Sequence, residues 1–214
     1  AQQIKKMEHK IPKYVDYIFT LSDSDQIYFE KILPKKTLQI PVTFNVENTD
    51  NLKIKNSIAH LGAMDWKPNI QGIDWFLSHV KPKLQKEDIN IYIAGKNMPH
   101  KYFKYQDTKT MIEGKIDNAK EYIKNKEIIF VPLFSGSGIR IKILEAMALG
   151  IPVISTSKGA EGIPYKNKQN ILIANSPLEF KNAICLLINN KKLAQQIGNQ
   201  GKQLILHHFS NEIV

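Results

Sequence analysis

The segment at 130–164 constrains the fold more than any other part of this sequence. It opens within an apolar run at 128–133, which is rich in branched residues and typical of a strand buried on both faces of a sheet. A loop of small residues at 135–138 follows, and a helical pattern then continues until Gly150 stops it. A second apolar strand at 152–155 completes the unit. This order predicts a parallel sheet with a helix N-terminus at its carboxyl edge, where unpaired backbone N–H groups favour an anion.

Two cations, Arg140 and Lys142, stand in the predicted first turn of that helix. The helix macrodipole disfavours cations there by up to about 1 kcal/mol, and a bound phosphate would compensate. The chain has 29 lysines and a single arginine, Arg140, whose planar guanidinium suits bidentate phosphate recognition. Glu145 shares a helical stripe with Gly138 and Lys142, so it is placed to reach a sugar hydroxyl. We predict that Arg140 and Lys142 are the catalytic residues.

A second interpretation of these residues stays open. Glycine-rich turns also serve close packing of a helix against a strand, and Lys142 with Glu145 would then be an ordinary solvated i,i+3 pair. We favour the anion site because neither the unfavourable dipole nor the single arginine has a structural explanation in the sequence.

The same residues resemble a known family. The run SGSGIRIKILEAMALGIPVISTSKGAEGI at 135–163 is similar to the donor-binding segment of the group 1 retaining glycosyltransferases, and closest to their bacterial branch. The resemblance implies the GT-B architecture of two Rossmann-like domains facing a cleft, with this chain as the C-terminal, donor-binding half. The wider family has two glutamates eight positions apart, where this chain has Ser137 and Glu145. The serine argues against a carboxylate contact to the transferred sugar from position 137.

Further loops would lie at the same edge of the sheet. In much of the family an arginine and a lysine after the first strand hold the donor diphosphate, but here Ala63 and Pro68 stand near those positions. The resemblance therefore implies that Arg140 and Lys142 supply the charge from the opposite loop. Gly62 would let the backbone approach the ligand.

Two other loops add weaker candidates. By the resemblance, the backbone of Ile116, close to Gly114, would read the edge of the nucleobase. Trp66 is as consistent with a cleft lid as with the core. Glu161 fits a sugar contact about as well as it fits a solvated loop carboxylate. The predicted substrate-binding residues are Gly62, Gly114, Ile116, Gly136, Ser137, Gly138, Ile139, Arg140, Lys142 and Glu145.

Strands and helices alternate after residue 52, which predicts an α/β fold with a doubly wound, Rossmann-like parallel sheet over residues 47–214. The predicted strands are 57–61, 89–94, 110–112, 127–131, 152–155 and 170–174, and helical segments begin near Asn69, Pro99, Asp117, Gly138 and Ser176. Residues 1–46 contain one predicted strand and two helical segments, too few for a core, before a polar linker at 46–51. By the resemblance, 1–46 are the remnant of the N-terminal domain and the hinge. We expect the chain to be part of a longer enzyme.

Composition and net charge limit the kinds of partner that the chain is expected to bind. The formal charge of +10 suits nucleotide diphosphates or an anionic membrane surface, while aromatic and basic residues do not interleave as nucleic-acid binding would require. Cys185 is the single cysteine and reads as a core residue, which fits a reducing cytoplasm. Histidines and acids show no spacing of metal ligands. We expect neither a metal nor a cofactor, and a cytoplasmic location with room for peripheral contact at the inner face of the membrane.

The sequence thus predicts a retaining, metal-independent glycosyltransferase of the hexosyltransferase class. It would move a sugar from a nucleotide-diphosphate donor to a lipid-linked or surface-polysaccharide acceptor. We expect the fragment alone to be inactive, since the acceptor site would belong to the other half. A non-catalytic nucleotide-binding module and a dinucleotide-binding oxidoreductase domain remain alternatives, although LGAMDW at 61–66 replaces the GxGxxG that the latter requires. An epimerase would need carboxylates that the sequence does not offer.

Overall fold

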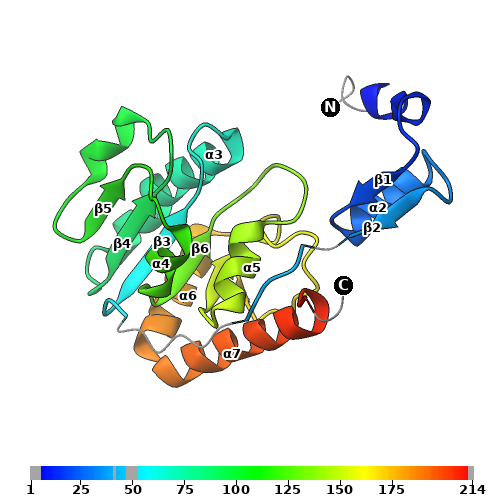
Figure 1. Cartoon of the computed structure of the whole chain (residues 1–214). Coiled ribbons are helices and arrows are strands. Elements are labelled where there is room, and N and C mark those ends of the chain that lie inside the picture. Colours follow the sequence, from blue (N-terminus) through cyan, green and yellow to red (C-terminus); the bar gives the residue numbers. More distant parts are fainter. Residues whose placement is uncertain (1–5, 41, 47–52, 212–214) are drawn as a thin grey trace.

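The computed structural model describes residues 6–40, 42–46 and 53–211. Its main body is a six-stranded parallel sheet in the order β5-β4-β3-β6-β7-β8, with helices on both faces (Figure 1). The predicted doubly wound sheet is confirmed. Its elements are β3 (Ser57–Leu61), α3 (Lys67–Trp75), a π-helical turn (Phe76–Val80), a 3-10 turn (Lys81–Leu84), β4 (Asn90–Ala94), a 3-10 helix (His100–Tyr105), β5 (Thr110–Glu113), α4 (Ala119–Lys124), β6 (Ile128–Val131), α5 (Ile141–Ala148), β7 (Val153–Ser155), β8 (Leu172–Ile173), α6 (Pro177–Asn189) and α7 (Lys191–His208). Within the described ranges no helix is long and apolar enough to cross a membrane.

The central strands are apolar throughout because alternate side chains enter two separate cores. On β3, Ile58 packs with residues of α3 and α6, whereas its neighbour Ala59 packs with residues of α5. Helix α7 contributes to both cores, through Ile197 to the first and Ile205 to the second. It therefore passes from one face of the sheet to the other, along the edge seen at the bottom of Figure 1.

The sequence predicted some helix ends more accurately than others. Ser176 caps α6 in the expected capping box with Glu179. Helix α5 begins at Ile141, three residues later than predicted, because Gly138 has a φ of +83° and cannot continue a helix. The segment expected near Pro99 is a 3-10 helix, and the last strand is shorter than predicted.

Residues before the main body form a small sheet of their own. Strands β1 (Ile18–Thr20) and β2 (Thr37–Gln39) pair in parallel and α2 (Asp23–Glu30), capped by Ser22, connects them, after a 3-10 turn at Ile11–Lys13. The sequence predicted a single strand here, and β2 is the second. The backbone N–H of Phe44 donates to the Phe209 carbonyl at 2.8 Å, which joins this part to the end of α7. The predicted linker at 46–51 lies almost wholly outside the described residues.

Candidate functional site

The strand order reverses between β3 and β6, and the loops that follow these two strands flank the reversal. From β3 the chain proceeds to β4 and β5 on one side, and from β6 to β7 and β8 on the other. In open α/β sheets, the crevice outside the carboxyl ends of the strands at such a point is the usual ligand site. The loops at 62–66 and 132–140 border it. The Ser135 hydroxyl donates to the side chain of Gln71 at 2.9 Å and so ties the second loop to α3.

The loop at 132–140 takes its shape from its glycines. Gly136 and Gly138 have φ angles of +92° and +83°, in the left-handed region where other residues are strained. A Cβ at Gly136 would also lie 2.9 Å from the ring of Trp66. The two glycines of the loop predicted to cradle a phosphate are therefore favoured by the backbone conformation itself.

Arg140 is the N-cap residue of α5, and its side chain folds back into the loop. Nη1 donates to the carbonyls of Ser137 and Gly138 at 2.5 and 2.7 Å. The guanidinium lies 5.2 Å from the ring centroid of Trp66, and the residue is 5 % exposed. Its buried Nε has no hydrogen-bond partner within the described residues. The single arginine thus has a structural role, bracing the loop, that the sequence did not reveal.

Lys142 extends from the first turn of α5 to α3. Its ammonium donates to Asn69 Oδ1 at 3.0 Å, and Asn69 Nδ2 donates in turn to the carbonyl of Ala63 at 2.7 Å. A Cβ at Gly62 would lie 2.4 Å from the ammonium, so a side chain at this position would displace it. Desolvation, and then the charge of Arg140, lower the pKa of Lys142 to about 7, with Glu145 acting in the opposite direction. These contacts exclude the alternative of a solvated surface pair.

Two titratable groups adjoin Lys142. Glu145 is partly buried, and desolvation raises the pKa of its carboxyl, while Lys142 lowers it. His60 is fully buried on β3, and its Nδ1 lies 3.1 Å from the carbonyl of Phe130, to which it must donate because a carbonyl only accepts. Desolvation and then Lys142 hold the pKa of His60 well below its usual value, so the ring is neutral.

Of the remaining candidates, Gly114 lies near the ends of β3 and β4, whereas Glu161 lies in an exposed ion pair. The N–H of Gly95 donates to the Gly114 carbonyl at 3.0 Å, and a Cβ at Gly95 would lie 1.8 Å from the carbonyl oxygen of Gly62. The ends of β3, β4 and β5 are therefore in close contact, which brings Gly114 to the edge of the crevice. Ile116, two residues on, is partly buried. Glu161 forms an exposed ion pair with Lys158 at 2.6 Å.

The sequence can now be placed among known proteins. Residues 55–190 match the profile of the family described as glycosyl transferases group 1. The chain belongs to this family. An uncharacterised 44.6 kDa protein in the cps region of Klebsiella pneumoniae is 27 % identical over 169 residues, which cover 74 % of this chain and 44 % of that protein. The chain thus spans less than half the length of this relative.

Solved structures with the same fold include glycosyltransferases with bound nucleotide. A S. aureus TarM mutant, crystallised with fondaparinux, α-GlcNAc-glycerol and UDP, superposes with a TM-score of 0.81 at 16 % identity, over 100 % of this chain and 45 % of that one. Anabaena HepE in complex with UDP and glucose gives 0.71 at 13 % identity, over 92 % and 60 % of the two chains. At these identities the likeness shows the GT-B fold.

Sequence reasoning missed Asn69 and His60 as neighbours of Lys142 in this candidate site. Asn69 is 3 % exposed in the first turn of α3, and an uncharged polar residue on the buried face of a helix was the available signal. His60 sits in the apolar strand SIAHL, where a histidine is unusual enough to single out. Both contacts join segments about seventy residues apart in the sequence, and the sequence pattern does not reveal such pairs.

Proposed function

We propose that the parent protein is a retaining, metal-independent glycosyltransferase that moves a sugar from a nucleotide-diphosphate donor to a lipid-linked or surface-polysaccharide acceptor. The observation that carries this proposal is the Lys142 ammonium, held by Asn69 over Gly62 in the crevice where the strand order reverses. A compact cation beside a glycine loop at this point in an α/β sheet suits the diphosphate of a nucleotide sugar. Family membership supports the reaction class.

In the proposed reaction the bond between the sugar and the diphosphate breaks, and the leaving diphosphate gains negative charge. Lys142 and the backbone amides from Gly136 to Ile139 would stabilise that charge in a partly dry site. Arg140 would act by keeping the loop in place and by its own positive charge. Glu145 would accept hydrogen bonds from the ribose hydroxyls, and the backbone near Gly114 and Ile116 would read the base.

We base the proposed metal independence on the side chains that the described part of the chain brings together. The described part of the chain contains no cluster of three or more His, Cys, Asp or Glu side chains able to hold a metal ion. The cations Lys142 and Arg140 would carry out the charge neutralisation that a divalent ion performs in other phosphate sites. Retention of configuration follows from the resemblance to the group 1 family and remains a proposal.

The proposal also assigns two parts of the chain to different domains of the parent protein. Residues 1–46 would be the remnant of the N-terminal domain with the hinge, and residues 47–214 the donor-binding domain. The UDP and sugar ligands of TarM and HepE support a nucleotide-sugar donor. Because the relatives are much longer, we expect this chain to bind donor nucleotide weakly and to turn nothing over. The protein would work in the cytoplasm, with peripheral contact to the membrane that carries its acceptor.

A thermal-shift titration with UDP, GDP, ADP and NAD tests the proposal. We expect one nucleoside diphosphate to raise the melting temperature, because ligand that binds only the folded state stabilises it by mass action. Lys142→Met and Arg140→Ala should each weaken that nucleotide by about tenfold or more, since a charge-assisted contact to phosphate is lost. Lys192→Met, which removes an exposed lysine of α7, is the matched control.

The outcomes separate the alternatives. An unchanged response in both Lys142→Met and Arg140→Ala would refute the assignment of the loop. Stabilisation by NAD alone would favour a dinucleotide-binding oxidoreductase domain instead. Arg140→Ala also removes the brace of the loop, so Lys142→Met is the more decisive variant.

A further inference from the structure

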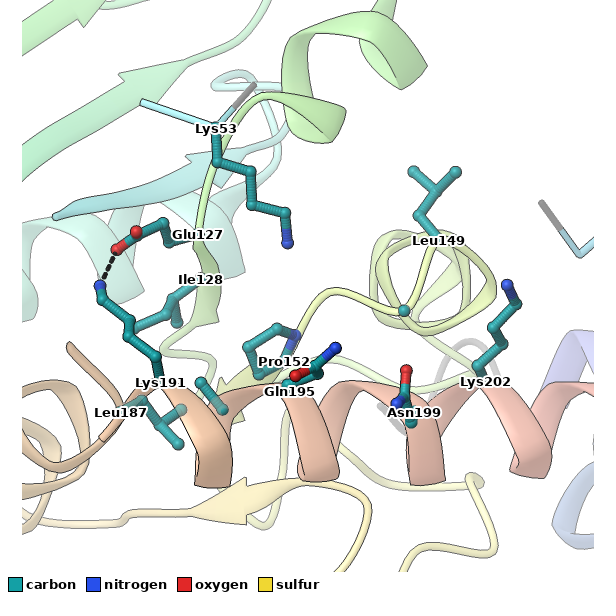
Figure 2. Close-up of a pocket in the computed structure, with 12 residues that line it drawn as sticks. Lys53, Glu127, Ile128, Leu149, Pro152, Leu187, Lys191, Gln195, Asn199 and Lys202 are labelled. Atoms are coloured by element: carbon teal, nitrogen blue, oxygen red, sulfur yellow. Dashed lines mark hydrogen bonds and ion pairs between the residues drawn. The ribbon is translucent and has the colours of Figure 1, made fainter. Parts of the chain in front are cut away.

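A second concave site lies at the opposite edge of the main sheet, where β6 and β7 begin. It is a cavity of about 430 Å³ between α7, the ends of α5 and α6, and the segment that enters β3 (Figure 2). Leu149 and Gly150, just past the C-terminus of α5, line it, whereas Arg140 caps the N-terminus of the same helix. The eight residues of α5 span ~12 Å, so the cavity is distinct from the crevice of the proposed donor site. Its polar lining residues are Lys53, Glu127, Lys191, Gln195, Asn199 and Lys202.

One stripe of α7 supplies most of this polar lining. Lys191, Gln195, Asn199 and Lys202 follow at intervals of four, four and three, which places them on one face of the helix. Figure 2 shows these side chains directed toward the cavity from α7. A helix with two amides and two lysines on the face that borders a cavity presents hydrogen-bond donors to it.

Lys53 enters from the opposite wall, and its ammonium points into the cavity in Figure 2. The residue is partly buried, and desolvation lowers its pKa, against the effect of Glu127. Among the described residues, none forms an ion pair or hydrogen bond with this ammonium. A partly desolvated lysine with no acceptor is costly unless an anion joins it.

Glu127, the single acid among the described lining residues, is already hydrogen-bonded within the chain. The Glu127 carboxylate accepts a hydrogen bond from the Lys191 ammonium at 2.6 Å and another from the backbone N–H of Asn56 at 3.0 Å. The Lys191 charge is therefore paired with Glu127, and Lys53 adds a cation that has no ion-pair partner among the described residues. Lysines are common in this chain, but here they converge from two segments 138 residues apart on one cavity.

We propose that this cavity binds a phosphomonoester about the size of a sugar phosphate. Lys53 is the central cation, Lys191 and Lys202 flank it, and the amides of Gln195 and Asn199 complete the donors. Lysine suits a phosphate as a compact point charge with three donors. The phosphomonoester belongs either to a free metabolite or to the headgroup of a phosphatidate in a membrane, and the experiment distinguishes these two sources.

Isothermal calorimetry of the 214-residue chain with glucose 1-phosphate tests the proposal, beside flotation with phosphatidylcholine vesicles that contain phosphatidate. Lys53→Gln and Gln195→Glu should each weaken binding by about tenfold, because one removes the central cation and the other adds an opposing charge. Gln196→Glu introduces the same charge at the next position of α7, outside the cavity lining, and should change the affinity by less than about twofold. Lys142→Met shows whether the phosphate binds in the proposed donor site instead.

Each result of these binding measurements supports or overturns the proposed phosphate site. Loss with Lys53→Gln and Gln195→Glu, but not with Gln196→Glu, supports the site, and the ligand that shows this pattern identifies its source. Equal loss with Gln195→Glu and Gln196→Glu would mean general charge attraction and overturns the proposal. Loss with Lys142→Met alone would place the phosphate in the donor crevice. Absence of binding by both probes up to ~10 mM, where even a weak site would be occupied, also overturns it.

Discussion

The charge on Lys142 depends on what occupies the crevice. In the free chain the pKa of Lys142 is about 7, so its side-chain amine is largely uncharged at pH 8. Desolvation and the charge of Arg140 disfavour the charged form. A diphosphate close to it would favour the charged form and raise the pKa again. Donor binding and proton uptake are then coupled through this residue.

We predict that UDP binding at pH 8 is accompanied by uptake of about one proton, because the pKa of Lys142 rises from about 7 to above the working pH. The phosphates of UDP are already ionised at pH 8 and contribute little. Calorimetry in buffers of different ionisation enthalpy measures the uptake. Lys142→Met should bind with uptake near zero, and an uptake equal to that of the unaltered chain would contradict the assignment.

Arg140 shows how one residue can serve two purposes. Its guanidinium satisfies carbonyls of its own loop and lies over Trp66, so it stabilises the loop whether or not a ligand is bound. The same contacts leave a positive charge beside the helix N-terminus that the sequence marked as an anion site. The sequence alone identified the charge and its position, but not its hydrogen-bond partners.

At the scale of elements, α7 packs on α5 and on the turn that follows α5 through glycines. A Cβ at Gly198 would lie 2.1 Å from the backbone carbonyl oxygen of Gly150, so the helix and the turn after α5 touch at this point. At Gly201 the nearest atoms would be Met147 Cγ at 3.1 Å, on a flexible side chain that can move, and the backbone carbonyl oxygen of Asn170 at 3.3 Å. The sequence predicts α7 as a surface helix and gives no sign of this contact.

Gly198→Ala should therefore lower the free energy of unfolding by about 2 kcal/mol, as overpacking does, although alanine is the better helix former. Gly201→Ala, on the same helix, should cost less than half as much, because Met147 can adjust and the nearest backbone atom lies at 3.3 Å instead of 2.1 Å. Urea denaturation of both variants, with the slope compared to the unaltered chain, measures the difference. If Gly198→Ala stabilised the protein, helix propensity would outweigh the contact and the packing argument would fail.

At the scale of the whole molecule, the two sheets differ in how far their apolar side chains are buried. Ile58 and Ala59 of β3 are wholly buried, with cores on both sides. In the small sheet, Phe19 and Leu38 stand opposite each other and are 59 % and 48 % exposed. Regions with few buried apolar contacts open at lower free energy than the core.

Native-state hydrogen exchange should show this difference directly. We expect the amides of β3 and β6 to exchange only through global unfolding, and those of β1 and β2 through a local opening at least about 2 kcal/mol lower in free energy. Mass spectrometry of peptic fragments over a urea series measures both. Equal opening free energies for the two sheets would show that they unfold as one unit.

The sequence by itself determined the fold class and the main elements. Apolar runs such as SIAHL and IIFV are buried on both faces only in a covered parallel sheet, and the capping box at Ser176 is local chemistry. The glycine loop and its two cations were likewise visible as a pattern. These features depend on residues a few positions apart, which sequence periodicity reports.

Only the tertiary structure decided which groups meet. The bond from Lys142 to Asn69, the neutral His60 against Phe130 and the cavity that joins Lys53 to α7 all connect segments far apart in the chain. Their pKa values follow from desolvation, which exists only once the sheet and its helices enclose them. The start of α5 at Ile141 was also settled by a backbone angle at Gly138 rather than by helix propensity. Local pattern therefore fixes the elements, and packing fixes the chemistry between them.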